Sequence, residues 1–122
     1  MRSIRSKDTK PEMRVRQVVY GLGYRYRLHV KSLPGCPDLV FTRRRRVLFV
    51  HGCFWHQHNG CHDAHMPKSR VSYWSAKLKR NVERDKRNVR MLKKMGWTSL
   101  IVWACEIEDE KCLASRLQEF LG

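Results

Sequence analysis

Acidic residues are scarce in this chain of 122 residues. Asp and Glu number 11 against 26 Lys and Arg, which gives a formal net charge of +15 with histidine neutral. So large a cationic excess repels itself and indicates a polyanionic partner, nucleic acid first of all. The sequence has no apolar run long enough to span a bilayer, and no segment that pairs a basic face with a large apolar one. We therefore expect no membrane partner.

The features of a signal peptide are also missing. Arg2, Arg5 and Lys7 are followed by further polar residues rather than by an apolar stretch, so we expect a cytoplasmic protein. The number of cysteines, five, is odd, which in that compartment argues against a disulfide framework and favours metal ligands or thiols. For Cys36 and Cys112 we expect small buried thiols.

No repeat, linker or low-complexity segment divides the chain, so we predict a single domain over residues 1–122. Apolar periodicity and turn residues predict the order helix, strand, strand, strand, irregular loop, helix, strand, helix. The segments are a helix from about Thr9 to Gly23, strands at 24–28, 38–41 and 47–50, a loop over 51–71, a helix over 72–95 ended by Gly96, a strand at 99–103, and a closing helix marked by Leu113, Leu117, Phe120 and Leu121. The apolar run 99–103 is typical of a central strand buried on both faces. This order predicts an α/β fold with a mixed sheet flanked by helices.

The irregular loop contains several potential zinc ligands. They are Cys53, His58, Cys61 and, just beyond the strand at 99–103, Cys105. Three ligands close in sequence with one distant thiolate suit a closed tetrahedral zinc site, and zinc would order a loop that is too polar to build a core. His62 and His65 are competing ligands. The alternative is that these are ordinary buried cysteines and a surface histidine.

Two aspartates stand at positions that need an explanation. Asp38 directly follows Pro37 at the start of a strand, where a carboxylate projects from the sheet and can hold a divalent cation. A turn-capping aspartate is the simpler alternative. Asp85 falls on the apolar stripe of its helix, which comprises Leu78, Val82, Val89 and Leu92. A carboxylate facing the interior is costly unless it is paired, so we expect a histidine, arginine or metal beside it.

Three further residues are candidates for acid–base chemistry. Glu12 shares the helical register of Val15 and Val19, although a capping box explains it equally well. His51 and His56 flank the sequence Gly-Cys-Phe-Trp at the end of the third strand. An imidazole there can move protons for an attacking water or a leaving oxygen. The alternative is a polar loop residue or a further metal ligand.

Aromatic and cationic residues alternate in and after the loop. Phe54 and Trp55 lie in a cationic segment, and Tyr73 and Trp74 follow downstream. Such residues suit stacking on bases, although isolated tryptophans more often cap a core. The run Arg43 to Arg46 forms a tight connection that either contacts phosphates or is a solvated turn.

Four motifs together resemble those of the very short patch repair endonucleases, also called Vsr. They are His51-Gly-Cys-Phe-Trp-His56, Pro37-Asp38, Asn81-Val-Glu-Arg-Asp85 and Trp103-Ala-Cys105. The similarity runs from Met1 to about Glu106, and the first motif is highly specific. The resemblance implies a restriction-endonuclease-like mixed β-sheet flanked by helices, with a zinc-stabilised loop. It also implies a single endonuclease domain in which residues 1–8 form an N-terminal arm that contacts DNA.

The resemblance further implies a role for each matched residue. Asp38 would ligate Mg²⁺ together with the main-chain carbonyl of Val50, a position where a family member has threonine. His56 would serve the proton transfers at the scissile phosphate. The other site residues would hold water of the metal's hydration shell, the phosphate or each other: Glu12, His51 and Asp85. The structural Zn²⁺ would be bound by Cys53, His58, Cys61 and Cys105. The DNA contacts would be made by Phe54, Trp55 and Trp74, which wedge into the duplex, and by Met1 and Ile4 of the arm.

The implied reaction is Mg²⁺-dependent hydrolysis of one DNA strand on the 5′ side of the thymine in a T·G mismatch. This nick would begin the very short patch repair of deaminated 5-methylcytosine. We expect the enzyme to act as a monomer on double-stranded DNA, and contacts with other mismatch-repair proteins are open. Two alternatives remain: a non-catalytic zinc-dependent nucleic-acid-binding protein, and a nuclease of the same fold with a different target.

Overall fold

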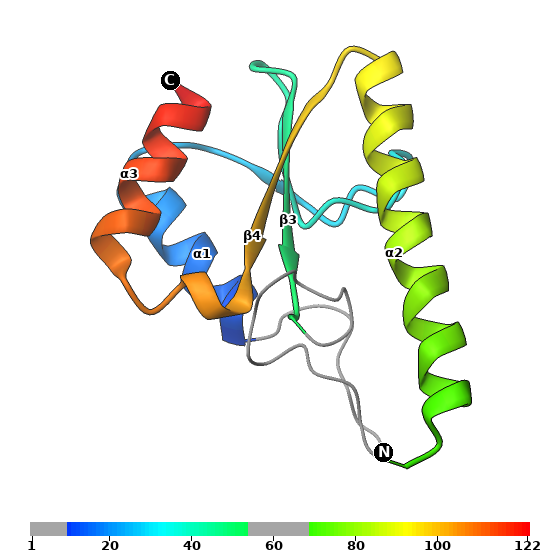
Figure 1. Cartoon of the computed structure of the whole chain (residues 1–122). Helices are drawn as coiled ribbons and strands as arrows, with labels where there is room; N and C mark the ends of the chain where they lie inside the picture. The colour runs from blue at the N-terminus through cyan, green and yellow to red at the C-terminus, as the bar shows by residue number, and fades with distance from the viewer. Residues whose placement is uncertain (1–9, 54–68) are drawn as a thin grey trace.

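The structure of the chain is a computed structural model, and it describes residues 10–53 and 69–122 (Figure 1). Its elements are α1 (Lys10–Gly21), β1 (Arg27–Leu28), β2 (Leu39–Phe41), β3 (Arg46–His51), α2 (Val71–Lys94), β4 (Thr98–Trp103), the 3-10 turn η2 (Ala104–Glu106) and α3 (Glu110–Leu121). The predicted order of helices and strands is confirmed for these residues. So is the α/β class.

The four strands form one mixed sheet in the order β1-β2-β3-β4. The first two pairings are antiparallel, and β3 pairs with β4 in parallel. The expectation that strand 99–103 is central is wrong, because within the described residues β4 pairs with β3 alone and lies at the edge. Its apolar run has another cause: Val102 packs into the core on one face and Ile101 into the core on the other.

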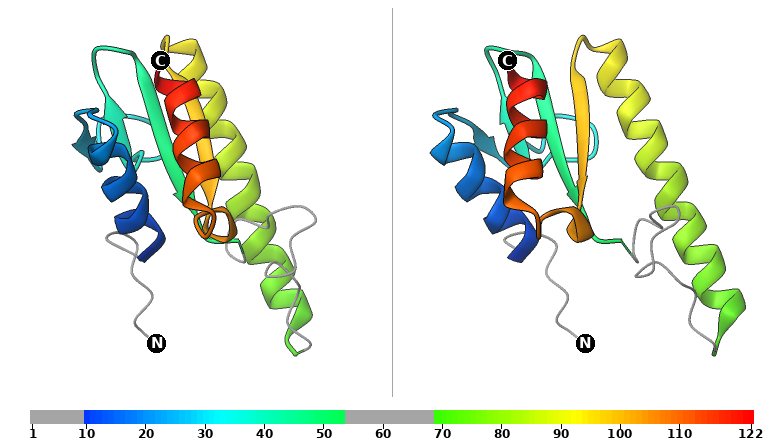
Figure 2. Two further views of the ribbon diagram at one scale, coloured as in Figure 1. Left: turned by 90° about the vertical axis from the view of Figure 1, so that its left-hand side faces the viewer. Right: turned by 60° about the vertical axis from the view of Figure 1, so that its left-hand side comes forward.

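Alternating side chains of the strands build a core on each face of the sheet. On one face, Leu39, Phe41 and Leu48 pack against α1 and α3. On the other face, Val40 and Val47 belong to a second cluster, which includes residues of α2 and of the turn after it. Figures 1 and 2 show the resulting three layers, with α1 and α3 on one side of the sheet and α2 alone on the other.

Glycines end two of the helices, as the sequence predicts. Gly23 and Gly96 adopt φ of 95° and 91°, a left-handed conformation that other residues rarely take. After α2 the N–H of Trp97 donates to the carbonyl of Leu92 at 2.9 Å, which closes a Schellman motif. The predicted cap at Thr9 lies outside the described residues. No helix in the described ranges is long and apolar enough to cross a membrane.

Two further details of the sequence prediction are wrong. The strand predicted over 24–28 is reduced to Arg27–Leu28, which is an edge strand of the sheet, and Leu28 is 41% exposed. Cys36 and Cys112 are exposed rather than buried. Cys36 lies in the turn before β2. Cys112 lies in the first turn of α3, where its N–H donates to the capping carboxylate of Asp109 and lowers the pKa of that acid.

The arginine run between β2 and β3 anchors the sheet to both helical layers. Arg44 Nε donates to the carbonyl oxygen of Leu121 at the end of α3 (2.8 Å), and Arg45 Nη2 donates to that of Met95 at the end of α2 (2.8 Å). The guanidinium groups also stack on rings, Arg44 on Tyr24, Arg45 on Trp97 and Arg46 on Phe120, at 4.9, 4.7 and 5.3 Å. Cations are favourable at helix C-termini, where backbone carbonyls lack partners. Three of the four arginines are therefore structural.

This anchoring predicts that Arg44→Ala destabilises the fold. The substitution removes a hydrogen bond to the end of α3 and a ring contact, together worth about 1–2 kcal/mol of unfolding free energy. Urea unfolding followed by circular dichroism measures the change. Arg43→Ala, in the same exposed turn, is the matched control and should change stability by less than about 0.5 kcal/mol. Equal effects of the two substitutions would contradict a structural role for Arg44.

Candidate active site

Asp38 is fixed by hydrogen bonds on both sides of its strand. Its N–H donates to the carbonyl of Leu48 at 3.0 Å, and its own carbonyl accepts from the N–H of His29 at 3.3 Å. The side-chain Oδ2 accepts from the N–H of Val50 at 2.6 Å. Since these bonds are made by the main chain of β3 and of the residue after β1, the position of Asp38 follows from strand pairing. The second oxygen, Oδ1, lies on the side of His29.

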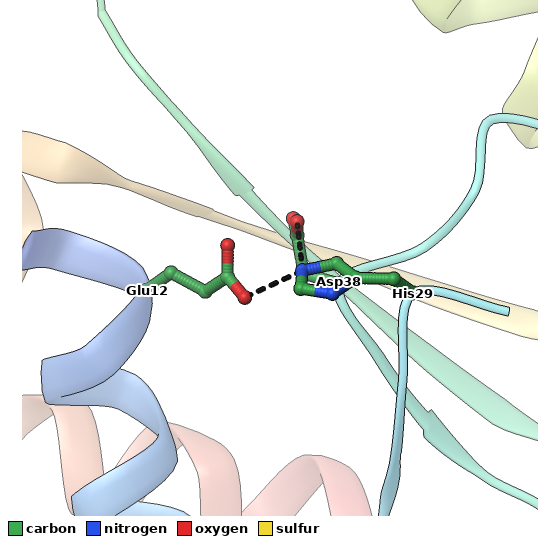
Figure 3. Close-up of side chains that lie close together, drawn as sticks. All are labelled: Glu12, His29 and Asp38. Carbon is green, nitrogen blue, oxygen red and sulfur yellow. Dashed lines mark ion pairs between the residues drawn. The ribbon is translucent and has the colours of Figure 1, made fainter. Parts of the chain in front are cut away.

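Glu12 is a buried acid in the first turn of α1, with 2% of its surface exposed. It forms an ion pair with Arg16, one helical turn further on, whose side chain is 12% exposed. A buried carboxylate needs such partners, because its loss of hydration is otherwise uncompensated. Glu12 points from α1 toward the sheet (Figure 3). The predicted alternative, a capping box, needs Thr9, which lies outside the described residues, so it stays a prediction.

His29 joins the two acids and was missed in the sequence analysis. Its Nε2 lies 2.7 Å from Glu12 Oε2 and 3.9 Å from Asp38 Oδ1. It follows β1 directly, and the antiparallel pair Leu28↔Leu39 places it opposite Asp38. The signal in the sequence was only a lone histidine after an alternating segment. The register between β1 and β2 brings His29 next to the acids, and this register cannot be read from the sequence.

The donor atoms of Glu12, His29 and Asp38 all lie within 4.8 Å of one another (Figure 3). Two carboxylates from different elements at this spacing suit a divalent cation such as Mg²⁺, which prefers oxygen ligands. The imidazole adds a nitrogen, a ligand of transition metals. Among the described residues, this group is the candidate metal centre.

The other predicted site residues in the described ranges do not belong to this group. His51 is buried at the end of β3, with its ring 5.7 Å from Phe49 and 5.2 Å from Trp103. Asp85 is half-buried on α2. The predicted helix face is thus confirmed, although Asp85 is less enclosed than the apolar stripe suggested. Val50 lies beside Asp38 through its N–H, and the role of its carbonyl stays a prediction.

Several predicted residues lie outside the part of the chain that the structure describes. They are Met1, Ile4, Phe54, Trp55, His56, His58 and Cys61, with the competing ligands His62 and His65. Trp74 is described: it is half-buried near the start of α2, and its ring lies 5.2 Å from that of Tyr73 in an edge-to-face arrangement.

Strand pairing also relates the two described cysteines of the predicted zinc site. β3 and β4 run in parallel, and His51 pairs with Trp103 at their ends. Cys53 and Cys105 each follow two residues later. The two chain segments therefore leave the sheet at the same end, next to one another, although their cysteines are far apart in sequence. Cys53 is buried, with 5% of its surface exposed, and Cys105 is exposed.

Helix α2 carries a strongly cationic outer face. Its exposed basic residues are Lys79, Arg80, Arg84, Lys86, Arg87, Arg90, Lys93 and Lys94, against one exposed acid, Glu83. The N-terminal half of this helix extends beyond the sheet at the end where β3 finishes (Figures 1 and 2). A long basic helix face suits contacts with the phosphates of a nucleic acid.

The comparison with known proteins agrees with this combination of acids and basic surface. A family model described as DNA mismatch endonuclease Vsr matches residues 1–63. The chain belongs to the Vsr family. A Type II nicking enzyme of Xanthomonas oryzae pv. oryzae, V.XorIIP, is 51% identical over 121 residues, which cover 99% of this chain and 88% of that protein. The DNA mismatch endonuclease Vsr of Escherichia coli K12 is 40% identical over 126 residues, covering 99% of this chain and 80% of that protein.

Membership of the Vsr family confirms the resemblance found in the sequence motifs. It also makes the chain a nuclease, because the matched relatives are endonucleases or nicking enzymes by name. A third relative, the nicking enzyme V.NmeAIP of Neisseria meningitidis, is 40% identical over 121 residues, covering 99% of this chain and 86% of that protein. Glu12 of α1 and Asp38, directly before β2, are the candidate acids of the described residues in this member of the family.

The ion pair inside this Vsr-family site predicts a large effect of Arg16→Met. The substitution leaves the Glu12 carboxylate buried without its cationic partner, so the unfolding free energy should fall by about 3 kcal/mol. Arg14→Met on the same helix is the control. Its ion pair with Glu110 (3.6 Å) has both side chains largely in solvent and should contribute less than about 0.5 kcal/mol. Chemical unfolding of the two variants would contradict this account if their losses were equal.

Proposed function

We propose that this Vsr-family chain is a Mg²⁺-dependent DNA mismatch endonuclease. It hydrolyses one strand on the 5′ side of the thymine of a T·G mismatch and so initiates very short patch repair. The observation that carries the proposal is the close approach of the buried Glu12 to Asp38 through His29. Burying a carboxylate to 2% exposure is costly, and in this proposal the cation that Glu12 helps to hold is the reason for its burial.

In this proposal the two acids hold the cation and the protein positions the DNA around it. Asp38 would bind Mg²⁺ through Oδ1, since its Oδ2 accepts from Val50 N–H. Glu12 would face the same cation from α1. Bound there, Mg²⁺ supplies a more acidic water and neutralises charge that develops on the phosphate. In this hydrolysis one phosphorus–oxygen bond of the backbone breaks, the oxygen of a water molecule forms a new bond to phosphorus, and the leaving oxygen takes up a proton.

The restriction-endonuclease-like character of the fold belongs to the same proposal. It is supported by the mixed sheet, with helices on both faces and the acids directly before β2 and on α1. A T·G wobble is less well paired than a matched step, so aromatic side chains open it at lower cost. Trp74, near the start of the basic helix α2, is the described candidate for such a contact, with Phe54 and Trp55 predicted from the sequence.

The test is nicking of an end-labelled duplex that contains one T·G mismatch, beside its matched T·A duplex. With Mg²⁺ we expect a cut only in the strand of the mismatched thymine. Asp38→Asn should reduce its rate by about 100-fold or more, since loss of groups that support a metal already costs 10–100-fold. Asp109→Asn removes the same charge at the cap of α3 and serves as the matched control.

The other outcomes separate the alternatives. Equal cutting of both duplexes would keep the nuclease and reject the mismatch specificity. Binding without cutting by the wild-type protein would reject the endonuclease and favour a zinc-dependent DNA-binding protein. Retention of full activity by Asp38→Asn would show that the reaction does not depend on this carboxylate.

We propose in addition that Cys53, His58, Cys61 and Cys105 bind a structural Zn²⁺. Support comes from the parallel pairing of β3 with β4, because the segments that contain Cys53 and Cys105 leave the sheet at the same end. The two strands thus bring two cysteines that are far apart in sequence to one end of the sheet, where both can belong to one tetrahedral site. His58 and Cys61 complete the set on sequence spacing alone. The zinc would tie the end of the sheet to the following loop.

The zinc proposal predicts that Cys105→Ser lowers both metal content and stability. Elemental analysis of the purified wild-type chain should give one zinc per molecule, and the variant should lose most of it, because four ligands close such a site. The melting temperature should fall with the zinc. Cys112→Ser, an exposed cysteine on α3, is the matched control and should keep the metal. Zinc retained at one equivalent in Cys105→Ser would remove this residue from the ligand set.

A further inference from the structure

His29 is the one member of the Glu12–His29–Asp38 group to which neither the motifs nor the proposed reaction gives a role. Its ring is held between the two acids, with Nε2 2.7 Å from Glu12 Oε2 and 3.9 Å from Asp38 Oδ1. The side chain is 17% exposed. A surface histidine that merely ends a strand would not be drawn into a group whose other members are both carboxylates.

The backbone of His29 is itself unusual. Its φ of 46° lies in the left-handed region, which costs a residue with a β-carbon about 1 kcal/mol or more. The same residue still donates its N–H to the carbonyl of Asp38 at 3.3 Å, so the ladder between β1 and β2 continues through it. The strained conformation is therefore held by pairing with the very residue that supplies the second carboxylate. Strain of this kind is found preferentially at functional sites.

The spacing of the three donor atoms fits common coordination of one ion. At bond lengths of about 2.1 Å, neighbouring ligands of an octahedral ion lie about 3 Å apart and opposite ligands about 4.2 Å apart. The measured separations of 2.7 and 3.9 Å fall close to these values. Two oxygens and one imidazole nitrogen, on three different segments of the chain, would then supply part of the coordination shell of the ion.

We propose that His29 is a third protein ligand of this metal centre and gives it a nitrogen donor. The centre would then bind Mn²⁺ more strongly, relative to the oxygen-preferring Ca²⁺, than two carboxylates alone do, because imidazole is a ligand of transition metals. This inference rests on the proposed function, which requires a bound cation. It adds that His29 determines which ion the centre prefers. A purely positioning histidine would affect all divalent ions alike.

The test compares binding of MnCl₂ and CaCl₂ to the full-length, zinc-replete protein without DNA. His29→Gln keeps the reach and a hydrogen-bond donor for Glu12 but replaces the ring nitrogen by an amide. We expect its Mn²⁺ affinity to fall at least about tenfold while Ca²⁺ affinity changes little. Electron spin echo spectroscopy of bound Mn²⁺ should lose the nitrogen coupling of a coordinated imidazole. Asp38→Asn should weaken the binding of both ions.

A second variant guards against a backbone effect. His29→Asn tolerates the left-handed conformation better than glutamine does, and thermal unfolding shows whether each variant is folded. Equal losses for Mn²⁺ and Ca²⁺ would overturn the ligand assignment in favour of positioning. An unchanged nitrogen coupling in folded His29→Gln and His29→Asn would overturn it outright. Because no DNA is present, these results are independent of whether the wild-type protein nicks a T·G duplex. Failure of the ligand assignment can therefore be distinguished from failure of the proposed function.

Discussion

The burial of the Glu12 carboxylate is the constraint on which the arrangement of α1, β1 and β2 depends. With only 2% of its surface exposed, this charge must be compensated by protein groups rather than by water. Arg16 supplies one partner from the same helix, and His29 supplies another from the end of β1. α1 thus contacts the sheet region through Glu12 and His29 as well as through Val15 and Val19 of the apolar core.

Strand pairing then determines the positions of the other residues of the site. His29 and Asp38 face each other because β1 and β2 are antiparallel, and Asp38 is tied to Val50 by the adjoining β3. The parallel pairing of β3 with β4 ends at His51 and Trp103, and Cys53 and Cys105 each follow two residues beyond that pair. His29 and Asp38 therefore owe their positions to the backbone of neighbouring strands, and Glu12 comes to them from α1. An enzyme site built in this way is preorganised, since main-chain hydrogen bonds rather than flexible side chains set the distances.

The sequence was informative where local chemistry decides the outcome. Asp38 after a proline, Glu12 in a helical register and Gly96 after a periodic segment all lie where their neighbours imply. It was uninformative where the outcome depends on partners far along the chain. The role of His29 follows from register between two strands, and the edge position of β4 depends on which strands pair. An apolar run indicates that both faces of a strand are buried, as they are at Ile101 and Val102 of β4. It does not indicate that the strand has a hydrogen-bonded neighbour on both sides.

The left-handed backbone of His29 has a consequence for how this protein can vary. Residues with a β-carbon adopt a φ near 46° only at a cost, and those found there most often are asparagine, aspartate and histidine itself. Of these, asparagine and aspartate are reached from a histidine codon by a single nucleotide change, and both present oxygen in place of nitrogen. The backbone conformation therefore limits the substitutions tolerated at position 29 to side chains that offer a different ligand atom but tolerate the same φ. Within such a lineage, the choice of ion can change while the architecture around it stays the same.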